Sequence, residues 1–132
     1  MSRMRIDNKE IREAQIFEII LDSFPDIIHS ADETGRIVFT NKKAESLLGY
    51  TREELLSMNV RQIYADEILK NVDKGFSELK KTGEFAIESM LKAKDGTRIP
   101  VEIRSFSIYD DDGKFIKTFS ILRDIRAIKE LQ

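Results

Sequence analysis

Residues 85–125 read FAIESMLKAKDGTRIPVEIRSFSIYDDDGKFIKTFSILRDI and hold the clearest pattern in the chain. Apolar and polar residues alternate along much of this stretch, and Asp-Gly interrupts it twice, at Asp95-Gly96 and at Asp112-Gly113. A period of two is typical of a strand with one buried face, and Asp-Gly is typical of a tight turn between antiparallel strands. The stretch therefore predicts a meander of antiparallel strands.

The preceding part of the chain predicts two more strands and several helices. Two β-rich runs, 27–31 and 36–40, are separated by an acidic turn that ends in Gly35. Thr51 and Glu54 have the spacing of a capping box, so a helix is expected to begin there, and a longer one is expected over 66–82. The expected fold is α+β: one five-stranded antiparallel sheet with helices on one face.

An amphipathic helix is expected over residues 8–24, before this fold begins. Its apolar side chains recur at helical spacing, and Pro25 ends it because proline disfavours the helical conformation in the residue before it. So wide an apolar face needs a partner, which is either the domain's own sheet or a second copy of the chain. The residues expected at the dimer contact are Ile16, Phe17, Ile20 and Leu21.

The composition excludes several classes of function. The chain has 132 residues, enough for one domain with its own core, and it has no cysteine, which excludes disulfides, a thiolate nucleophile and cysteine-ligated metal centres. With 22 basic and 24 acidic residues, it lacks the charge balance of a polyanion-binding surface, so nucleic acid is not an expected partner. The apolar run 16–28 is broken by Glu18, Asp22 and Asp26, which argues against a membrane span. We expect a cytoplasmic domain without membrane contact.

No set of residues predicts catalysis or metal binding. His29 is the only histidine, and its place on an expected strand beside apolar residues favours a hydrogen-bonded structural histidine over a base or a ligand. The acidic run 110–112 precedes a turn glycine and lacks the alternating oxygen ligands and distal glutamate of a calcium loop. We therefore expect no catalytic residue and no metal site.

The order of several short motifs resembles the PAS domain family. These motifs are Asp26-Ile27-Ile28, Asp32-Glu33-Thr34-Gly35-Arg36-Ile37, Asn41, Leu47-Leu48-Gly49-Tyr50, Lys94-Asp95-Gly96, Asp112-Gly113 and Arg123-Asp124-Ile125. Each is short, but their order and spacing together are specific, and the resemblance covers about residues 24–126. It implies a sensory or dimerising module of the kind found in histidine kinases, cyclic-di-nucleotide enzymes and transcription regulators. It also implies a parallel dimer through the helix before the core, and a core that holds a small ligand, a cofactor or nothing.

The resemblance also narrows the choice of cofactor, whose identity stays unknown. Flavin sensing through a covalent adduct and the cinnamoyl chromophore both need a cysteine, which this chain lacks. Haem-sensing members use a histidine on the helix that corresponds to residues 66–82, whereas His29 lies on the first strand. A noncovalent flavin, a small organic ligand and a filled core remain open.

Several apolar residues are expected to face the space between the sheet and the helices. They form either a ligand cavity or an ordinary filled core. The candidates are Phe39, Tyr64, Leu69, Phe76, Ile87, Ile103 and Phe119.

The end of the chain is expected to lead into an output linker. Many PAS domains end with Asp-Ile-Thr, whereas here Asp124-Ile125 is followed by Arg126, so the contact of the threonine hydroxyl is absent. Every third residue from Leu122 to Leu131 is apolar, which predicts a short helix with one apolar edge and with Asp124 at its N-cap position. Asp124 and Ile125 are therefore the expected signal-output residues.

The expected organisation is a dimerisation helix in 1–24, a PAS sensor domain in 25–126 and the start of a linker helix in 127–132. The favoured function is that of a non-catalytic sensor domain in a larger signal-transduction protein, foremost a sensor histidine kinase of a two-component system. Its expected partners are a second copy of the chain, a C-terminal effector module and a small molecule. The alternatives are a ligand-free constitutive dimerisation module, or the sensor domain of a cyclic-di-nucleotide enzyme or transcription regulator.

Overall fold

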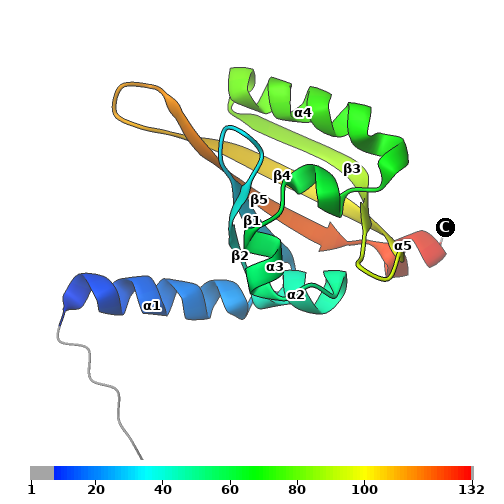
Figure 1. The fold of residues 1–132 in the computed structure, drawn as a ribbon, viewed down its shortest axis with the longest axis horizontal. Coiled ribbons are helices and arrows are strands. Elements are labelled where there is room, and N and C mark those ends of the chain that lie inside the picture. The colour runs from blue at the N-terminus through cyan, green and yellow to red at the C-terminus, as the bar shows by residue number, and fades with distance from the viewer. Residues whose placement is uncertain (1–7, 132) are drawn as a thin grey trace, which may run out of the picture.

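The computed structural model describes residues 8–131, which form one antiparallel sheet of five strands in the order β2-β1-β5-β4-β3, with helices (Figure 1). The strands are β1 (Ile27–Ala31), β2 (Ile37–Thr40), β3 (Glu84–Lys92), β4 (Arg98–Tyr109) and β5 (Phe115–Asp124). The helices are α1 (Lys9–Asp22), α2 (Lys42–Leu48), α3 (Arg52–Leu56), α4 (Leu69–Thr82) and α5 (Arg126–Glu130), with 3₁₀ turns η1 (Val60–Ile63) and η2 (Asp66–Ile68). The expected α+β fold is confirmed.

The two Asp-Gly turns join β3, β4 and β5 into the predicted meander. Both turn glycines adopt the left-handed conformation, with φ of 89° at Gly96 and 81° at Gly113. β5 then pairs with β1, Ile27 facing Leu122 in register. The first strand of the domain therefore lies beside the last one, in the middle of the sheet.

The helices between β2 and β3 begin where the sequence places their caps. The Asn41 side chain accepts a hydrogen bond from the backbone of Ala44 at the start of α2. At the start of α3, the Thr51 hydroxyl and the Glu54 carboxylate each accept from the other residue's backbone N–H, at 3.1 and 3.0 Å. This reciprocal pair is the predicted capping box.

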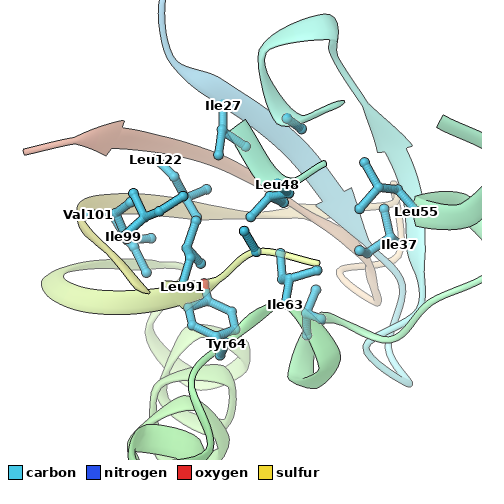
Figure 2. Packing of buried hydrophobic residues seen from close by; sticks show 14 of the residues in the cluster. Ile27, Ile37, Leu48, Leu55, Ile63, Tyr64, Leu91, Ile99, Val101 and Leu122 are labelled. Atoms are coloured by element: carbon cyan, nitrogen blue, oxygen red, sulfur yellow. The ribbon is translucent and has the colours of Figure 1, made fainter. Parts of the chain in front are cut away.

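The apolar core lies between these helices and one face of the sheet, which we call the inner face (Figure 2). α4 lies over the β3 side of the same face (Figure 1). Burial of each large aliphatic side chain here stabilises the fold by about 1.5–3 kcal/mol. The largest apolar side chains that are fully buried in this core are Ile27, Ile37, Leu48, Leu55, Ile63, Leu91, Ile99, Val101 and Leu122.

Helix α1 projects away from the domain instead of covering its sheet (Figure 1). It begins after Asn8, whose side chain caps it, and ends at Asp22. Ile16, Phe17 and Ile20 are 49%, 56% and 49% exposed, so the alternative in which the helix covers its own sheet is wrong. Leu21, by contrast, is 4% exposed and is buried within its own chain, which corrects its expected place at a dimer contact.

The C-terminal helix begins one residue later than the expected cap implies. Asp124 still pairs with Val101 in the sheet, so its backbone is extended, and Ile125 is the N-cap of α5. Asp124 therefore precedes the cap and does not occupy it. The parts of the predicted N-terminal and linker segments that comprise residues 1–7 and Gln132 lie outside the described residues.

Candidate ligand pocket and output junction

A cavity of about 90 Å³ lies between α4 and the inner face of the sheet. Its exposed lining residues, Asn71 of α4 with Ile87 and Glu88 of β3, mark its open side. Its buried lining residues at the sheet include His29 of β1 and Ser120 of β5. The cavity therefore has a mouth between α4 and β3 and a closed end over the centre of the sheet.

The structure brings together only part of the expected pocket residues. Leu69 packs against the core cluster without lining the cavity. Phe119 pairs with Phe106, and Phe39 pairs with Ser30, on the opposite, outer face of the sheet. The expected residues that do line the cavity are Tyr64, Phe76, Ile87 and Ile103, and their role in ligand binding stays a prediction.

Two features of the strands explain why Phe119 and Phe39 lie on the outer face and not, as expected, at the cavity. In β5 the small polar residues Thr118 and Ser120 point inward, so the larger apolar Phe119 between them points outward. In β2 the register shifts between Ser30 and Ala31 of its partner strand, which moves Phe39 to the outer face. A change of one residue in register exchanges the two faces of a strand.

A row of polar side chains, which we call the polar row, crosses the sheet at the closed end of the cavity, and three of its members, His29, Ser105 and Ser120, line the cavity. Three pairings in register join its members: Thr40 with His29, His29 with Ser120, and Ser120 with Ser105. His29, Ser105 and Ser120 are all at most 6% exposed. The next row on the inner face is entirely apolar and consists of Ile27, Leu122, Ile103 and Ile87.

His29 lies in this row without a hydrogen-bond partner. It is 5% exposed, and neither ring nitrogen is hydrogen-bonded to any of residues 8–131. Burial lowers the pKa of His29 to about 4, so the ring is neutral at physiological pH. The expectation of a hydrogen-bonded structural histidine is therefore wrong: the ring carries an unused donor and an unused acceptor.

The neighbouring hydroxyl groups differ in how their hydrogen-bonding capacity is used. The Oγ atoms of Ser105 and Ser120 lie 2.6 Å apart and hydrogen-bond to each other. Nearer α4, the Thr118 hydroxyl accepts from the Ala31 backbone, and the Ser107 hydroxyl donates to the Leu79 carbonyl oxygen. The sequence analysis did not predict Ser105 and Ser120 as pocket residues. Ser105 could have been found, because it follows Val101 and Ile103 at the next inward position of the same strand.

One residue at the mouth is connected to the end of the chain. Lys129 of α5 donates a hydrogen bond of 3.0 Å to the carboxylate of Glu88 on β3. The two side chains are 42% and 60% exposed, so solvent screens this ion pair. The contact nevertheless places α5 beside the cavity mouth.

Asp124 and Arg126 connect the end of β5 to the start of α5, which together form the candidate output junction. The Asp124 carboxylate accepts from the Arg126 backbone N–H at 3.0 Å and from its guanidinium at 2.7 Å. Partial burial opposes ionisation of Asp124, but the hydrogen bonds from Arg126 together outweigh it and hold the pKa of Asp124 below its usual value. Arg126 thus fastens the end of β5 to the start of α5.

Residues 8–131 contain neither a cluster of metal-binding side chains nor a helix suited to span a membrane. No group of three or more histidine, cysteine, aspartate or glutamate side chains lies close enough to hold a metal ion. Within the same range, no helix has both the length and the apolar character needed to cross a membrane.

Comparisons with known proteins agree with this fold. A family model of the PAS domain matches residues 25–127, so the chain belongs to the PAS domain family. The methyl sulfide methyltransferase-associated sensor of Methanosarcina acetivorans is 32% identical over 118 residues, which are 88% of this chain and 12% of that protein. The chain thus spans a small part of the length of this curated relative.

Solved PAS domains share the fold at low sequence identity. A PAS domain from Colwellia psychrerythraea superposes with a TM-score of 0.79 at 24% identity, covering 89% of this chain and 98% of that one. The PAS domain of an HTR-like protein from Haloarcula marismortui gives 0.75 at 23% identity, covering 89% and 96%. A PAS domain from a two-component sensor histidine kinase gives 0.75 at 16% identity, covering 88% and 99%. The chain is a PAS sensor domain.

Proposed function

We propose that this domain senses a compact small molecule that binds in the cavity between α4 and the sheet. The observation that carries the proposal is the cavity itself, because a filled core would leave no such volume. A cavity of about 150 Å³ holds benzene, so about 90 Å³ suits roughly four non-hydrogen atoms. Haem and flavin are far larger than this volume, which supports a compact ligand over either cofactor.

The signal leaves the cavity along β5 and reaches α5. Ser120 lines the cavity, and Asp124, four positions further on the same strand, is fastened to the first residue of α5. A second route runs from Glu88 at the mouth to Lys129. Both contacts support a role for ligand binding in setting the direction of α5.

The domain acts within a cytoplasmic signal-transduction protein, foremost a sensor histidine kinase. This part of the proposal is supported by family membership and by the sensor and histidine kinase domains among the similar proteins. The effector is joined through α5, and α1 pairs the domain with a second copy of the chain.

One observation favours a second candidate, the constitutive dimerisation module without a ligand. The apolar side chains of α1 are exposed in the single chain, as expected of a helix that pairs with another copy. In that case the cavity holds only water and dimer geometry alone determines the state of the effector.

Ligand binding separates the two candidates. Native mass spectrometry of the purified protein is expected to show a bound small molecule in stoichiometric amount. Val72→Phe, which fills the cavity from α4, is expected to remove it, whereas Ser77→Phe, on an exposed position of the same helix, is expected to retain it. The ligand proposal fails if the purified protein carries no bound small molecule and no small molecule binds wild type better than it binds Val72→Phe. The dimerisation module is then the function.

A further inference from the structure

The closed end of the cavity offers hydrogen-bonding groups that the described chain does not use. Both ring nitrogens of His29 are buried and unpartnered, and the residue lines the cavity. Burying a polar group without a partner costs free energy, and native proteins seldom leave such groups unmatched. A molecule in the cavity that hydrogen-bonds to His29 would therefore remove this cost.

The serine pair beside His29 has capacity left as well. When two hydroxyl groups bond to each other, one O–H is used and the second O–H remains a free donor. The 2.6 Å contact between the Ser105 and Ser120 oxygens is the only hydrogen bond that either side chain makes with residues 8–131. With His29 adjacent to Ser120 in register, donors and an acceptor lie together in the polar row.

The same end of the cavity offers nothing that balances a charge. The His29 ring is neutral, since burial lowers its pKa to about 4. Among the lining residues only Glu88 carries a charge, and it lies exposed at the mouth, where Lys129 pairs with it. An ionised ligand at the closed end is buried without a counterion, which is strongly unfavourable.

We propose that the cavity selects an uncharged molecule of about four non-hydrogen atoms that both donates and accepts hydrogen bonds at one end, with His29 and the Ser105–Ser120 pair as its polar contacts. A small amide or alcohol has this chemistry. The apolar body of the ligand packs against Ile103 and Val72. This inference rests on the proposed function, because it requires that the cavity take up a ligand.

Three probes of nearly the same size and shape test the polar end. Acetamide donates and accepts, acetone only accepts, and acetate carries a charge. Each is titrated into ¹⁵N-labelled protein, and binding is followed by the chemical shifts of the residues that line the cavity. We expect acetamide to bind about tenfold more tightly than acetone or acetate, because only acetamide matches both an unused donor and an unused acceptor.

Two variants identify His29 as the contact. His29→Leu is expected to lower acetamide affinity to the level of acetone while it changes acetone affinity less than about twofold. His29→Asn, which keeps a donor and an acceptor, is expected to restore part of the preference for acetamide. If His29→Leu does not fold, the relative affinities of the three probes for wild type still show whether the cavity prefers an uncharged donor and acceptor.

The outcomes separate this inference from the function on which it rests. Equal binding of acetamide and acetone to wild type, or an unchanged preference in folded His29→Leu, overturns the role of the polar row and leaves the cavity as a binding site. If none of the probes shifts the cavity residues of wild type, the cavity takes up no compact molecule and the proposed function itself is wrong.

Discussion

The side-chain amide of Asn41 donates a hydrogen bond of 2.9 Å to the main-chain oxygen of Leu21, the one buried residue of α1. Its Nδ2 also donates to the Asp26 carbonyl oxygen at 3.0 Å, and its Oδ1 accepts from the Ile28 N–H at 3.0 Å. Asn41 is completely buried. One amide therefore joins the end of α1, the segment before β1, and the start of α2.

Asn41→Ala is expected to lower the free energy of unfolding by about 2–4 kcal/mol, because it leaves several buried main-chain groups without partners. Asn8→Ala is the matched control. Asn8 caps the exposed start of α1, and its loss is expected to cost about 1 kcal/mol. Urea denaturation measures both. Equal losses in the two variants contradict a special role for Asn41.

The free energy of unfolding is expected to fall as the pH drops from about 6.5 to about 4. The folded pKa of His29, about 4, lies below its usual value of 6.5 because the ring is buried. In this window the unfolded state binds a proton that the folded state does not, so acid favours unfolding, by about 3 kcal/mol at the low end. Above pH 6.5 the stabilising effect is fully present.

His29→Leu isolates this contribution. Carboxylates with lowered pKa values, such as Asp32 and Asp95, also destabilise the fold in acid, but mainly below about pH 4.5. Urea denaturation at several pH values between 4.5 and 7 gives the free energy of unfolding. This free energy is expected to fall with falling pH in wild type and to stay almost constant in His29→Leu. If the free energy of unfolding depends on pH in the same way in both proteins, the ring is protonated in the folded state and is not buried as described.

Most of the fold follows from local sequence signals. The Asp-Gly turns at 95–96 and 112–113 determine the meander, and the capping box at Thr51 determines where α3 begins. These signals work because they depend on backbone conformation over a few residues. The position of α1 relative to the domain does not follow from a local signal. Its apolar residues show that the helix needs a partner, but they do not show whether that partner lies in the same chain.

The pocket was predictable only in part, because strand facing depends on long-range register. Apolar residues alternate clearly around Ile87 and Ile103, and both line the cavity, whereas their role in ligand binding stays a prediction. Phe119 lies on the outer face, because the inward positions on either side of it are the small polar residues Thr118 and Ser120. The polar row arises only when four strands align, so no local pattern brings His29 beside Ser120.

Gly75 is expected to determine how closely α4 approaches the sheet. A Cβ atom built there meets Cζ of Phe85 at 2.8 Å, so alanine forces the ring to move. Phe85 lines the cavity, and its displacement is expected to change both its ring resonances and the affinity for acetamide. The gain in helix propensity, about 0.5–1 kcal/mol, offsets part of the clash in the free energy of unfolding.

Ser77→Ala is the control for this variant, because it lies exposed on the same helix and leaves Phe85 untouched. It is expected to keep wild-type ring resonances and acetamide affinity. Unchanged Phe85 resonances in Gly75→Ala indicate that α4 has moved as a whole and that glycine is not required for the contact.

Ile16→Glu combined with Ile20→Glu is expected to convert a dimer into a monomer. Both side chains are 49% exposed in the single chain, so charge there disturbs an intermolecular contact and leaves the fold of the domain intact. Sedimentation velocity measures the change in mass. Gln15→Glu adds a carboxylate to α1 without removing an apolar side chain, and it is expected to remain dimeric. A dimer mass that survives the double substitution places the interface elsewhere.

Asp124→Ala is expected to change effector activity in the full-length protein while this domain stays folded. The carboxylate binds the Arg126 guanidinium at 2.7 Å across the boundary between β5 and α5, so its loss frees the start of α5 from the strand that borders the cavity. Because the Arg126 side chain is 43% exposed, the pair contributes only about 1 kcal/mol or less to folding.

A double-mutant cycle and a control decide whether the contact transmits the signal. Arg126→Ala is expected to act like Asp124→Ala, and the double variant is expected to add nothing, because both remove the same interaction. Arg123→Ala is the control: its guanidinium lies 3.7 Å from Asp26, near the same junction but outside this contact. Effector activity is measured with and without the signal, and thermal unfolding of the isolated domain confirms that each variant folds. Wild-type activity and response in Asp124→Ala remove Asp124 from the mechanism, and the Glu88–Lys129 contact is then the remaining route from cavity to α5.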